Sequence, residues 1–132
     1  MMTKLANLTG RILIAQIFLL AGINKISGYA ATQGYMEAMG VPAVLLPLVI
    51  LLEVGGALAL IAGWKTRWTA LALAGFSILA ALLFHADFAD HMQMLMFMKN
   101  IAIAGGLLAL AAQGEEETIS VDSRQVQAGQ RA

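Results

Sequence analysis

Residues 43–63 read AVLLPLVILLEVGGALALIAG, a run of 21 residues in which one carboxylate, that of Glu53, interrupts an otherwise apolar stretch. A helix of about 20 apolar residues crosses the roughly 30 Å hydrocarbon core of a bilayer. Backbone groups in lipid find no water to bond, so such a span must be helical. Glu53 then lies near the middle of the membrane, where an ionised side chain needs a partner or a function.

The rest of the chain repeats this apolar pattern. Of the 132 residues, 60% are hydrophobic and 12% are charged, whereas soluble domains carry about 25% charged residues. Residues 1–31 resemble a secretory signal, but nothing after them resembles a soluble mature protein, and we interpret the first apolar segment as a span. The sequence predicts an all-α fold, an integral membrane four-helix bundle over residues 1–112. Its spans are expected at about 8–26, 43–63, 68–86 and 95–112.

The distribution of charge predicts the topology. Four spans place both termini on one side, and that side holds six cations, Lys4, Arg11, Lys65, Arg67, Arg124 and Arg131. The opposite side holds Lys25 and Lys99. The positive-inside rule therefore places the N- and C-termini in the cytoplasm. The polar tail, residues 113–132, lacks periodicity and is expected to be a disordered cytoplasmic segment.

The connection over residues 27–42, SGYAATQGYMEAMGVP, is longer than a tight turn needs. Its apolar residues Tyr29, Tyr35, Met36 and Met39 suit one side of a short helix lying at the outer membrane interface. A simple surface loop fits the same length. The sequence leaves these two alternatives open.

Several functional classes receive no support. The chain has no cysteine, which excludes dithiol chemistry and thiolate metal sites formed by this chain alone. Its net charge is zero and it has no basic stripe, so we expect no nucleic-acid partner. No phosphate-binding loop or nucleophile motif is present, and no catalytic residue can be named. We expect no covalently bound cofactor.

The polar residues in the spans define a candidate site. On helical faces, Lys25 aligns with Arg11 and Gly22, Glu53 with Gly56 and Leu60, and Lys99 with Ile103 and Gly106. Intramembrane charges usually face the bundle interior and pair there, so we expect Lys25 or Lys99 to hold Glu53, unless that carboxyl is protonated. The candidate ligand-binding pocket lies in the outer half of the bundle and comprises Asn24, Lys25, Glu53, His85, Lys99 and Asn100.

Two other interpretations compete with a ligand pocket. The first is a buried polar clamp that only fixes helix register. The second is a metal site, because His85, Asp87, Asp90 and His91 are followed by four methionines at every second position, and thioether and imidazole donors suit Cu(I). That spacing spreads the methionines around a helix instead of gathering them. We therefore expect no metal site and treat the segment after His85 as a solvated loop.

Three stretches of sequence together resemble a known family. They are GRILIAQIFLLAGINKISGY at 10–29, LLEVGGALALIAGWKTR at 51–67 and FMKNIAIAGGLLALA at 97–111. In this order and spacing the chain resembles the DoxX family of small four-helix inner-membrane proteins, over about residues 8–112. The resemblance implies a multi-pass protein of a bacterial inner membrane. The family pattern marks Arg11, Gly22, Lys25, Glu53, Gly55, Gly56, Lys99 and Asn100.

The resemblance also carries functional expectations. Some relatives are small subunits of a thiosulfate:quinone oxidoreductase, and others are assigned as quinol oxidase subunits. We therefore expect an accessory, non-catalytic subunit that binds a quinone, with the electron-carrying groups on a redox-enzyme partner. Lys25, His85 or Lys99 would bond a quinone carbonyl, and Glu53 would relay a proton. The alternatives are a stand-alone binding or permeation protein for a small apolar molecule, which would work as a homo-oligomer, and a structural scaffold.

Overall fold

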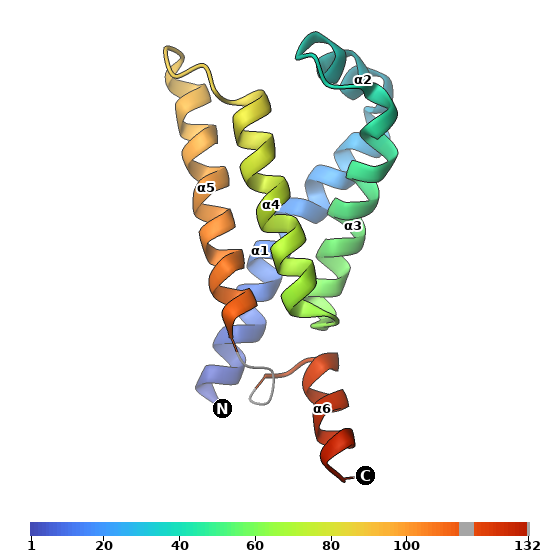
Figure 1. Ribbon diagram of the computed structural model, residues 1–132, viewed down its shortest axis with the longest axis vertical. Coiled ribbons are helices and arrows are strands. Elements are labelled where there is room, and N and C mark those ends of the chain that lie inside the picture. The colour runs from blue at the N-terminus through green and yellow to red at the C-terminus, as the bar shows by residue number, and fades with distance from the viewer. Residues whose placement is uncertain (114–117, 132) are drawn as a thin grey trace.

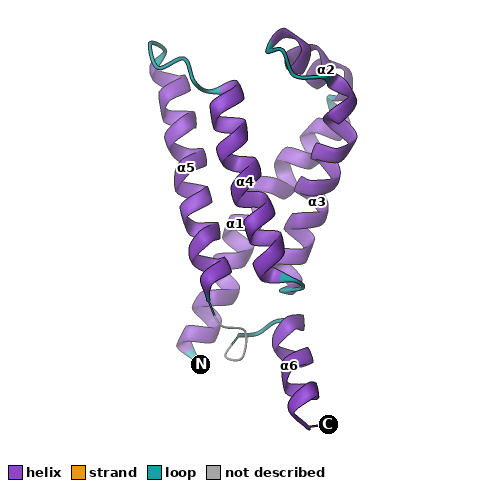
Figure 2. Ribbon diagram, viewed as in Figure 1, coloured by secondary structure: helices purple, strands orange, loops and turns teal. Residues whose placement is uncertain are grey.

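The computed structural model describes residues 1–113 and 118–131, and within these ranges it contains helices and no strands. Four helices in this part of the chain are long and apolar enough to cross a membrane (Figure 1, Figure 2). They are α1 (Met2–Ser27), α3 (Leu46–Ala62) with the preceding 3-10 turn η1 (Ala43–Leu45), α4 (Thr66–Phe84) and α5 (His91–Ala112). The predicted all-α fold with four membrane-spanning helices is confirmed.

Local sequence explains where the spans begin and end. Pro47 lies in the first turn of α3, where its missing N–H and fixed φ are tolerated. α3 ends at Gly63, whose φ of +71° is a left-handed conformation that glycine adopts without strain. α5 begins after Asp90, whose side chain accepts a hydrogen bond from the Met92 N–H and so caps the first turn.

The four spans form two packed pairs, α1 with α3 and α4 with α5. α3 and α4 connect the two pairs at the end of the molecule that carries Met1 and helix α6 (Val121–Arg131), which we call the termini end (Figure 1). The pairs diverge toward the opposite end, which carries helix α2 (Tyr29–Ala38) and which we call the α2 end (Figure 1). Small side chains dominate the core and allow the helices to pack closely. Close packing matters in a membrane because the hydrophobic effect does not drive helices together in lipid. The buried core residues are Ala15, Phe18, Ala57, Leu60, Ala70, Leu73, Ala74, Ala104, Leu107 and Ala111.

The connection over residues 27–42 contains a helix, α2 (Tyr29–Ala38), so the helical alternative is the one observed. Met36 on this helix is buried, with 5% of its surface exposed. The Tyr35 ring stacks on the Phe84 ring at the last residue of α4, with 5.4 Å between ring centroids. α2 therefore reaches from the α1–α3 pair across to α4.

The tail differs from the expected disorder in its described part, because Val121–Arg131 forms a helix, α6. Asp122 is buried, and its carboxylate accepts hydrogen bonds from the backbone N–H groups of Lys65 at 2.7 Å and Thr66 at 2.8 Å. The first N–H groups of a helix have no partner inside it, and here a carboxylate from a distant segment binds those at the start of α4. The order of polar and apolar residues along the chain does not predict this contact between the tail and the start of α4. Residues 114–117 and 132 of the predicted tail lie outside the described residues.

Candidate functional site

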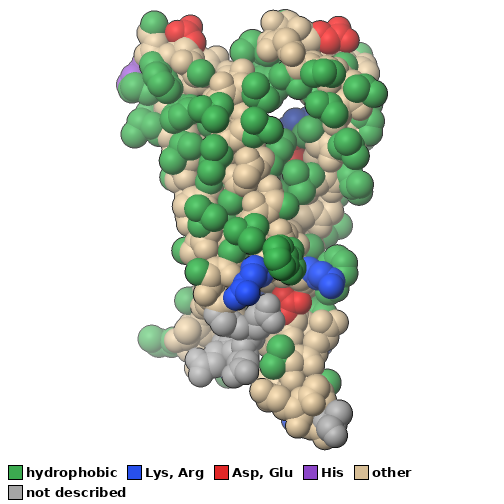
Figure 3. Space-filling model, in the orientation of Figure 1, with side chains coloured by type: hydrophobic (Ala, Val, Ile, Leu, Met, Phe, Trp, Pro, Cys, Tyr) green, Lys and Arg blue, Asp and Glu red, His purple; other side chains and the backbone are tan. Residues whose placement is uncertain are grey.

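A cavity of about 400 Å³ lies between the α1–α3 pair and the α4–α5 pair at the α2 end, and we call it the intramembrane cavity. Helices α1 to α5 all contribute to its wall. Figure 3 shows a hollow near the upper end of the molecule, bordered by hydrophobic side chains, with a basic and an acidic side chain visible inside it. Small-molecule sites commonly occupy roughly 300–1,000 Å³, so the cavity has a suitable size.

The wall of the cavity is largely apolar. Aliphatic and aromatic side chains such as Phe18, Phe76, Leu83 and Ile103 form most of it. An apolar wall with a few convergent polar groups is typical of sites that bind small organic molecules. The polar lining residues are Lys25, Thr32, Tyr35, Glu53, Ser77, His85 and Asn100.

An ion pair lies in this wall. The Lys25 Nζ is 2.8 Å from the Glu53 Oε1, and the two side chains are 29% and 1% exposed. Apart from this ion pair, neither Glu53 oxygen has a hydrogen-bond partner within residues 1–113 and 118–131. Of the two lysines expected to hold Glu53, the structure therefore selects Lys25. Both oxygens of the Glu53 carboxylate are buried, and Glu53 is one of the residues that line the cavity.

Gly22 explains how α1 and α3 bring the ion pair together. A Cβ atom at Gly22 would lie 2.6 Å from Val54 Cγ2 and 3.3 Å from Glu53 Cβ. Only glycine therefore lets the α1 backbone approach α3 so closely at this level. Lys25 lies three residues further along α1, on the same helical face, and its ammonium reaches Glu53.

The structure brings together four of the six predicted site residues. Lys25, Glu53, His85 and Asn100 line the intramembrane cavity. Asn24 and Lys99 are exposed and are absent from its wall. Asn24 directly precedes Lys25, and Lys99 directly precedes Asn100, and in both cases the second residue lines the cavity. Successive side chains on a helix point about 100° apart, which explains why the first residue of each pair does not.

The expected inner face of α5 is correct for Ile103 and wrong for Lys99 and Gly106. Ile103 lines the cavity and is partly buried, whereas Lys99 and Gly106 are exposed and the buried residues of α5 are Ala104, Leu107 and Ala111. α5 has apolar or small residues on nearly every face, so its composition fixes no orientation. The packing against α4 decides which stripe lies inside, and Lys99 faces out.

The segment after His85 uses its polar groups within the loop. The His85 Nδ1 lies 3.1 Å from the Gln93 Oε1, which links the end of α4 to the start of α5. Asp87 and Asp90 each accept a hydrogen bond from the backbone N–H two residues further on. The described residues contain no group of three or more His, Cys, Asp or Glu side chains that could hold a metal ion.

Comparison with known proteins decides the family. The DoxX family model matches residues 6–86. The chain belongs to the DoxX family. It is 59% identical over 107 residues to the inner membrane protein YqjF of Escherichia coli K12, a match that covers 81% of this chain and 82% of that protein. It is 32% identical over 124 residues to the inner membrane protein YphA of the same organism, a match that covers 89% of this chain and 88% of that protein. No solved structure matches the chain.

The comparisons extend what the fold shows. Four apolar helices and the similarity to two inner membrane proteins identify this DoxX chain as a multi-pass inner-membrane protein. The matched range covers most of α1 and all of α2 to α4, and it includes Lys25, Glu53 and His85, whereas Asn100 on α5 lies beyond residue 86. Of the positions marked by the DoxX pattern, Gly55 and Lys99 are exposed.

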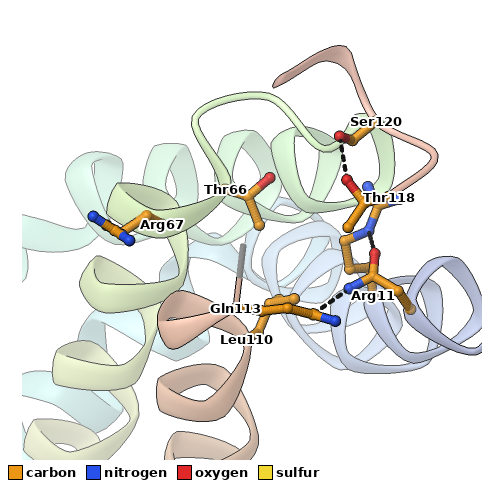
Figure 4. Close-up of a pocket in the computed structure, with 8 residues that line it drawn as sticks. Arg11, Thr66, Arg67, Leu110, Gln113, Thr118 and Ser120 are labelled. Atoms are coloured by element: carbon orange, nitrogen blue, oxygen red, sulfur yellow. Dashed lines mark hydrogen bonds between the residues drawn. The ribbon is translucent and has the colours of Figure 1, made fainter. Parts of the chain in front are cut away.

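A second polar cluster lies at the termini end of this DoxX protein, around Arg11 (Figure 4). Arg11 is 1% exposed, and its guanidinium donates hydrogen bonds to the backbone carbonyls of Leu60 and Ile61 in α3, to the carbonyl of Ile119 in the tail and to the side chain of Asn7. The space beside it is about 20 Å³, which holds about one water molecule. We therefore interpret this cluster as a structural hydrogen-bond network that holds α1, α3 and the tail together.

Sequence reasoning named only four of the residues that line the intramembrane cavity, and Ser77, Tyr35 and Phe84 are among those it missed. Ser77 is the one hydroxyl within residues 70–84 of α4, and that isolation was a signal for it. Tyr35 and Phe84 line the cavity and stack on each other. Tyr35 was expected on the apolar side of a short helix, but its partner Phe84 comes from another span, and sequence gives no sign of their contact.

Proposed function

We propose that this DoxX protein is an accessory subunit of a membrane redox system, and that it binds a quinone-like molecule in the intramembrane cavity. The ring headgroup would lie at Lys25 and Glu53, and its apolar chain would run along the aromatic and aliphatic wall. A redox-enzyme partner would carry the electron-transfer groups. Within this chain, Lys25 would orient an oxygen of the headgroup and Glu53 would exchange a proton with it.

One observation carries the proposal: the wall of a largely apolar cavity contains the Lys25–Glu53 ion pair, whose buried carboxylate has no other hydrogen-bond partner in the part of the chain that the structure describes. The few polar residues of the wall suit a ring headgroup with polar oxygens, and the apolar part of the wall suits a long apolar chain. A clamp that only fixed helix register would not need a cavity of about 400 Å³ beside it. Intramembrane ionisable residues with an open space beside them are candidates for function.

The test is to fill the cavity without touching the ion pair. Ala80 lies in the cavity wall on α4, and Ala80→Trp would place an indole in the space for the ligand. Ala72 is exposed on the same helix, so Ala72→Trp is a matched control with the same added volume. We expect Ala80→Trp to lower the quinone that co-purifies in mild detergent by at least about tenfold, measured by mass spectrometry, whereas Ala72→Trp retains it.

Other outcomes would change the assignment. Equal quinone content in both variants would contradict the proposal. A bound small apolar molecule without a ring headgroup would favour a stand-alone binding protein. Protein that purifies without any ligand, together with a Glu53→Gln variant that loses thermal stability only, would favour a scaffold.

We further propose that both termini face the cytoplasm. The termini end carries Arg11, Lys65 and Arg67 beside the docked tail, whereas Lys25 lies at the α2 end. An excess of lysine and arginine marks the cytoplasmic side of a membrane protein. A fluorescent reporter that folds only in the cytoplasm, fused after the tail, should fluoresce, and the same reporter inserted after Asp87 should not. The reverse pattern would overturn this topology.

A further inference from the structure

Gln16 is a polar side chain on the outer side of α1. It lies near the middle of the span predicted over residues 8–26, and it is exposed. The buried face of α1 points away from it and consists of Arg11, Ala15, Phe18 and Gly22. The Gln16 carboxamide makes no hydrogen bond in the part of the chain that the structure describes. A single copy in a bilayer would therefore leave this amide in hydrocarbon without a partner, which is unfavourable.

Gln16 belongs to a row of exposed residues along α1. This row, which we call the α1 stripe, consists of Thr9, Leu13, Gln16, Leu20, Ile23 and Ser27. Its members follow one another at alternating intervals of four and three residues, the heptad spacing that lines the seam between two packed helices. No member is charged, so two copies of the stripe meet without repulsion. One polar residue within an apolar seam fixes the register and the number of helices that associate.

We propose that the protein forms a parallel homodimer in the membrane through the α1 stripe, with the Gln16 carboxamides of the two copies hydrogen-bonded to each other. Two copies of one chain cross the membrane in the same orientation, so position 16 of both lies at the same depth. A twofold axis brings identical positions together, and a carboxamide is both donor and acceptor, so it pairs with its own kind. Polar side chains of this type hold helices together in lipid.

A second copy therefore satisfies the amide that one copy leaves unpaired. The α1 stripe lies on the side of the helix away from its buried face, so the contact requires no rearrangement of the four-helix bundle. The dimer is independent of the proposed function, because it assumes no ligand in the intramembrane cavity.

Single cysteines test the interface in the native membrane. The chain has no cysteine, so an introduced thiol can form a disulfide only with another molecule. Leu20→Cys places the thiol on the α1 stripe, and Leu82→Cys is the same change at an exposed position of α4. After oxidation with copper phenanthroline, we expect Leu20→Cys to run at twice the monomer mass and Leu82→Cys to stay monomeric. Equal cross-linking of both variants, no cross-link from Leu20→Cys, or its cross-link to a different protein would overturn the proposal.

A change of the amide tests the hydrogen bond itself. Gln16→Leu puts an apolar side chain of similar size at an exposed position, so each copy should still fold, which thermal unfolding in detergent checks. Because each dimer loses a pair of amide hydrogen bonds, its dissociation constant in liposomes, measured by energy transfer between labelled copies, should rise roughly 10- to 100-fold. Gln127→Leu, the same change at an exposed position of α6, should leave the constant unaltered. Wild-type and Gln16→Leu proteins that associate equally, or a wild-type protein that stays monomeric at every density, would refute the role of Gln16.

Discussion

Replacing Lys25 by methionine is expected to lower the free energy of unfolding by roughly 2–4 kcal/mol, because the change leaves the Glu53 carboxylate buried without its partner. Glu53 is 1% exposed and its carboxylate has no hydrogen bond among the described residues, so the 2.8 Å ion pair with Lys25 is its one polar contact there. Lys25 is 29% exposed, which places the effect somewhat below the roughly 3–5 kcal/mol of a fully buried pair. Unfolding of the purified protein in mixed detergent micelles measures the change.

A matched control and a double variant make this result specific. Lys99→Met is the same chemical change at an exposed lysine of α5, and it should leave the stability within about 0.5 kcal/mol of the wild type. The double variant Lys25→Met, Glu53→Met should recover most of the lost stability, since two apolar side chains of similar volume replace a buried ion pair at little cost. A stable Lys25→Met variant, or a double variant as unstable as Lys25→Met alone, would contradict the importance of the pair.

The double variant also separates a clamp from a ligand site. If the ion pair only fixes the packing of α1 on α3, the stable double variant should keep whatever partner activity the wild type supports. If the pair binds a headgroup, the double variant should fold and still lose the ligand. Stability and ligand content measured on one preparation therefore distinguish the scaffold from the proposed function.

Replacing Gly63 by alanine is expected to lower the free energy of unfolding by roughly 2–3 kcal/mol. Gly63 has a φ of +71°, a conformation that an L-residue with a Cβ adopts at a cost of about 1–2 kcal/mol. A Cβ there would also lie 2.3 Å from the Arg11 Nη1 and 2.3 Å from Ser120 Cβ. The tail would be pushed away from the turn between α3 and α4. Thermal unfolding and hydrogen exchange of α6 report the two effects.

Glycine and tail variants control this experiment. A Cβ at Gly55, in the middle of α3, would meet nothing within 4 Å, so Gly55→Ala should be neutral or slightly stabilising. Asp122→Ala removes the carboxylate that caps α4 and should cost about 1–2 kcal/mol, with faster exchange of the α6 amides. If Gly63→Ala is as stable as Gly55→Ala, the tail does not lie against this turn.

The candidate site was predictable to the extent that polar residues are rare in this chain. Lys25, Glu53, His85 and Asn100 stand out because an apolar span contains few such groups, and all four line one cavity. Lys99 stood out for the same reason and faces away. Rarity identifies a polar residue as a candidate, but the rotation of its helix decides where it points, and on an almost uniformly apolar helix no periodicity reports that rotation.

Family membership and the spans followed from linear order. The motifs around Arg11, Glu53 and Lys99 indicated the DoxX family, and the family model and the relatives confirm it. The tail was the largest departure from expectation. The tail is polar and was expected to be disordered, yet Asp122 binds N–H groups 56 and 57 residues earlier in the chain. A contact that satisfies the free end of another helix depends on proximity in space, and composition does not encode it.

The sequence by itself determined that this protein crosses the membrane four times, because a bilayer requires about 20 apolar residues per span and satisfied backbone groups throughout. It also indicated that an ionised Glu53 would need a partner there, with Lys25 and Lys99 as the candidates. Only the tertiary structure decided that the partner is Lys25, that α1 approaches α3 at Gly22, and that the two helix pairs diverge to leave the intramembrane cavity beside the ion pair. The reason is that lipid-facing and core-facing residues are equally apolar in a membrane protein, so hydrophobicity identifies the spans but leaves their packing to the shapes of the side chains.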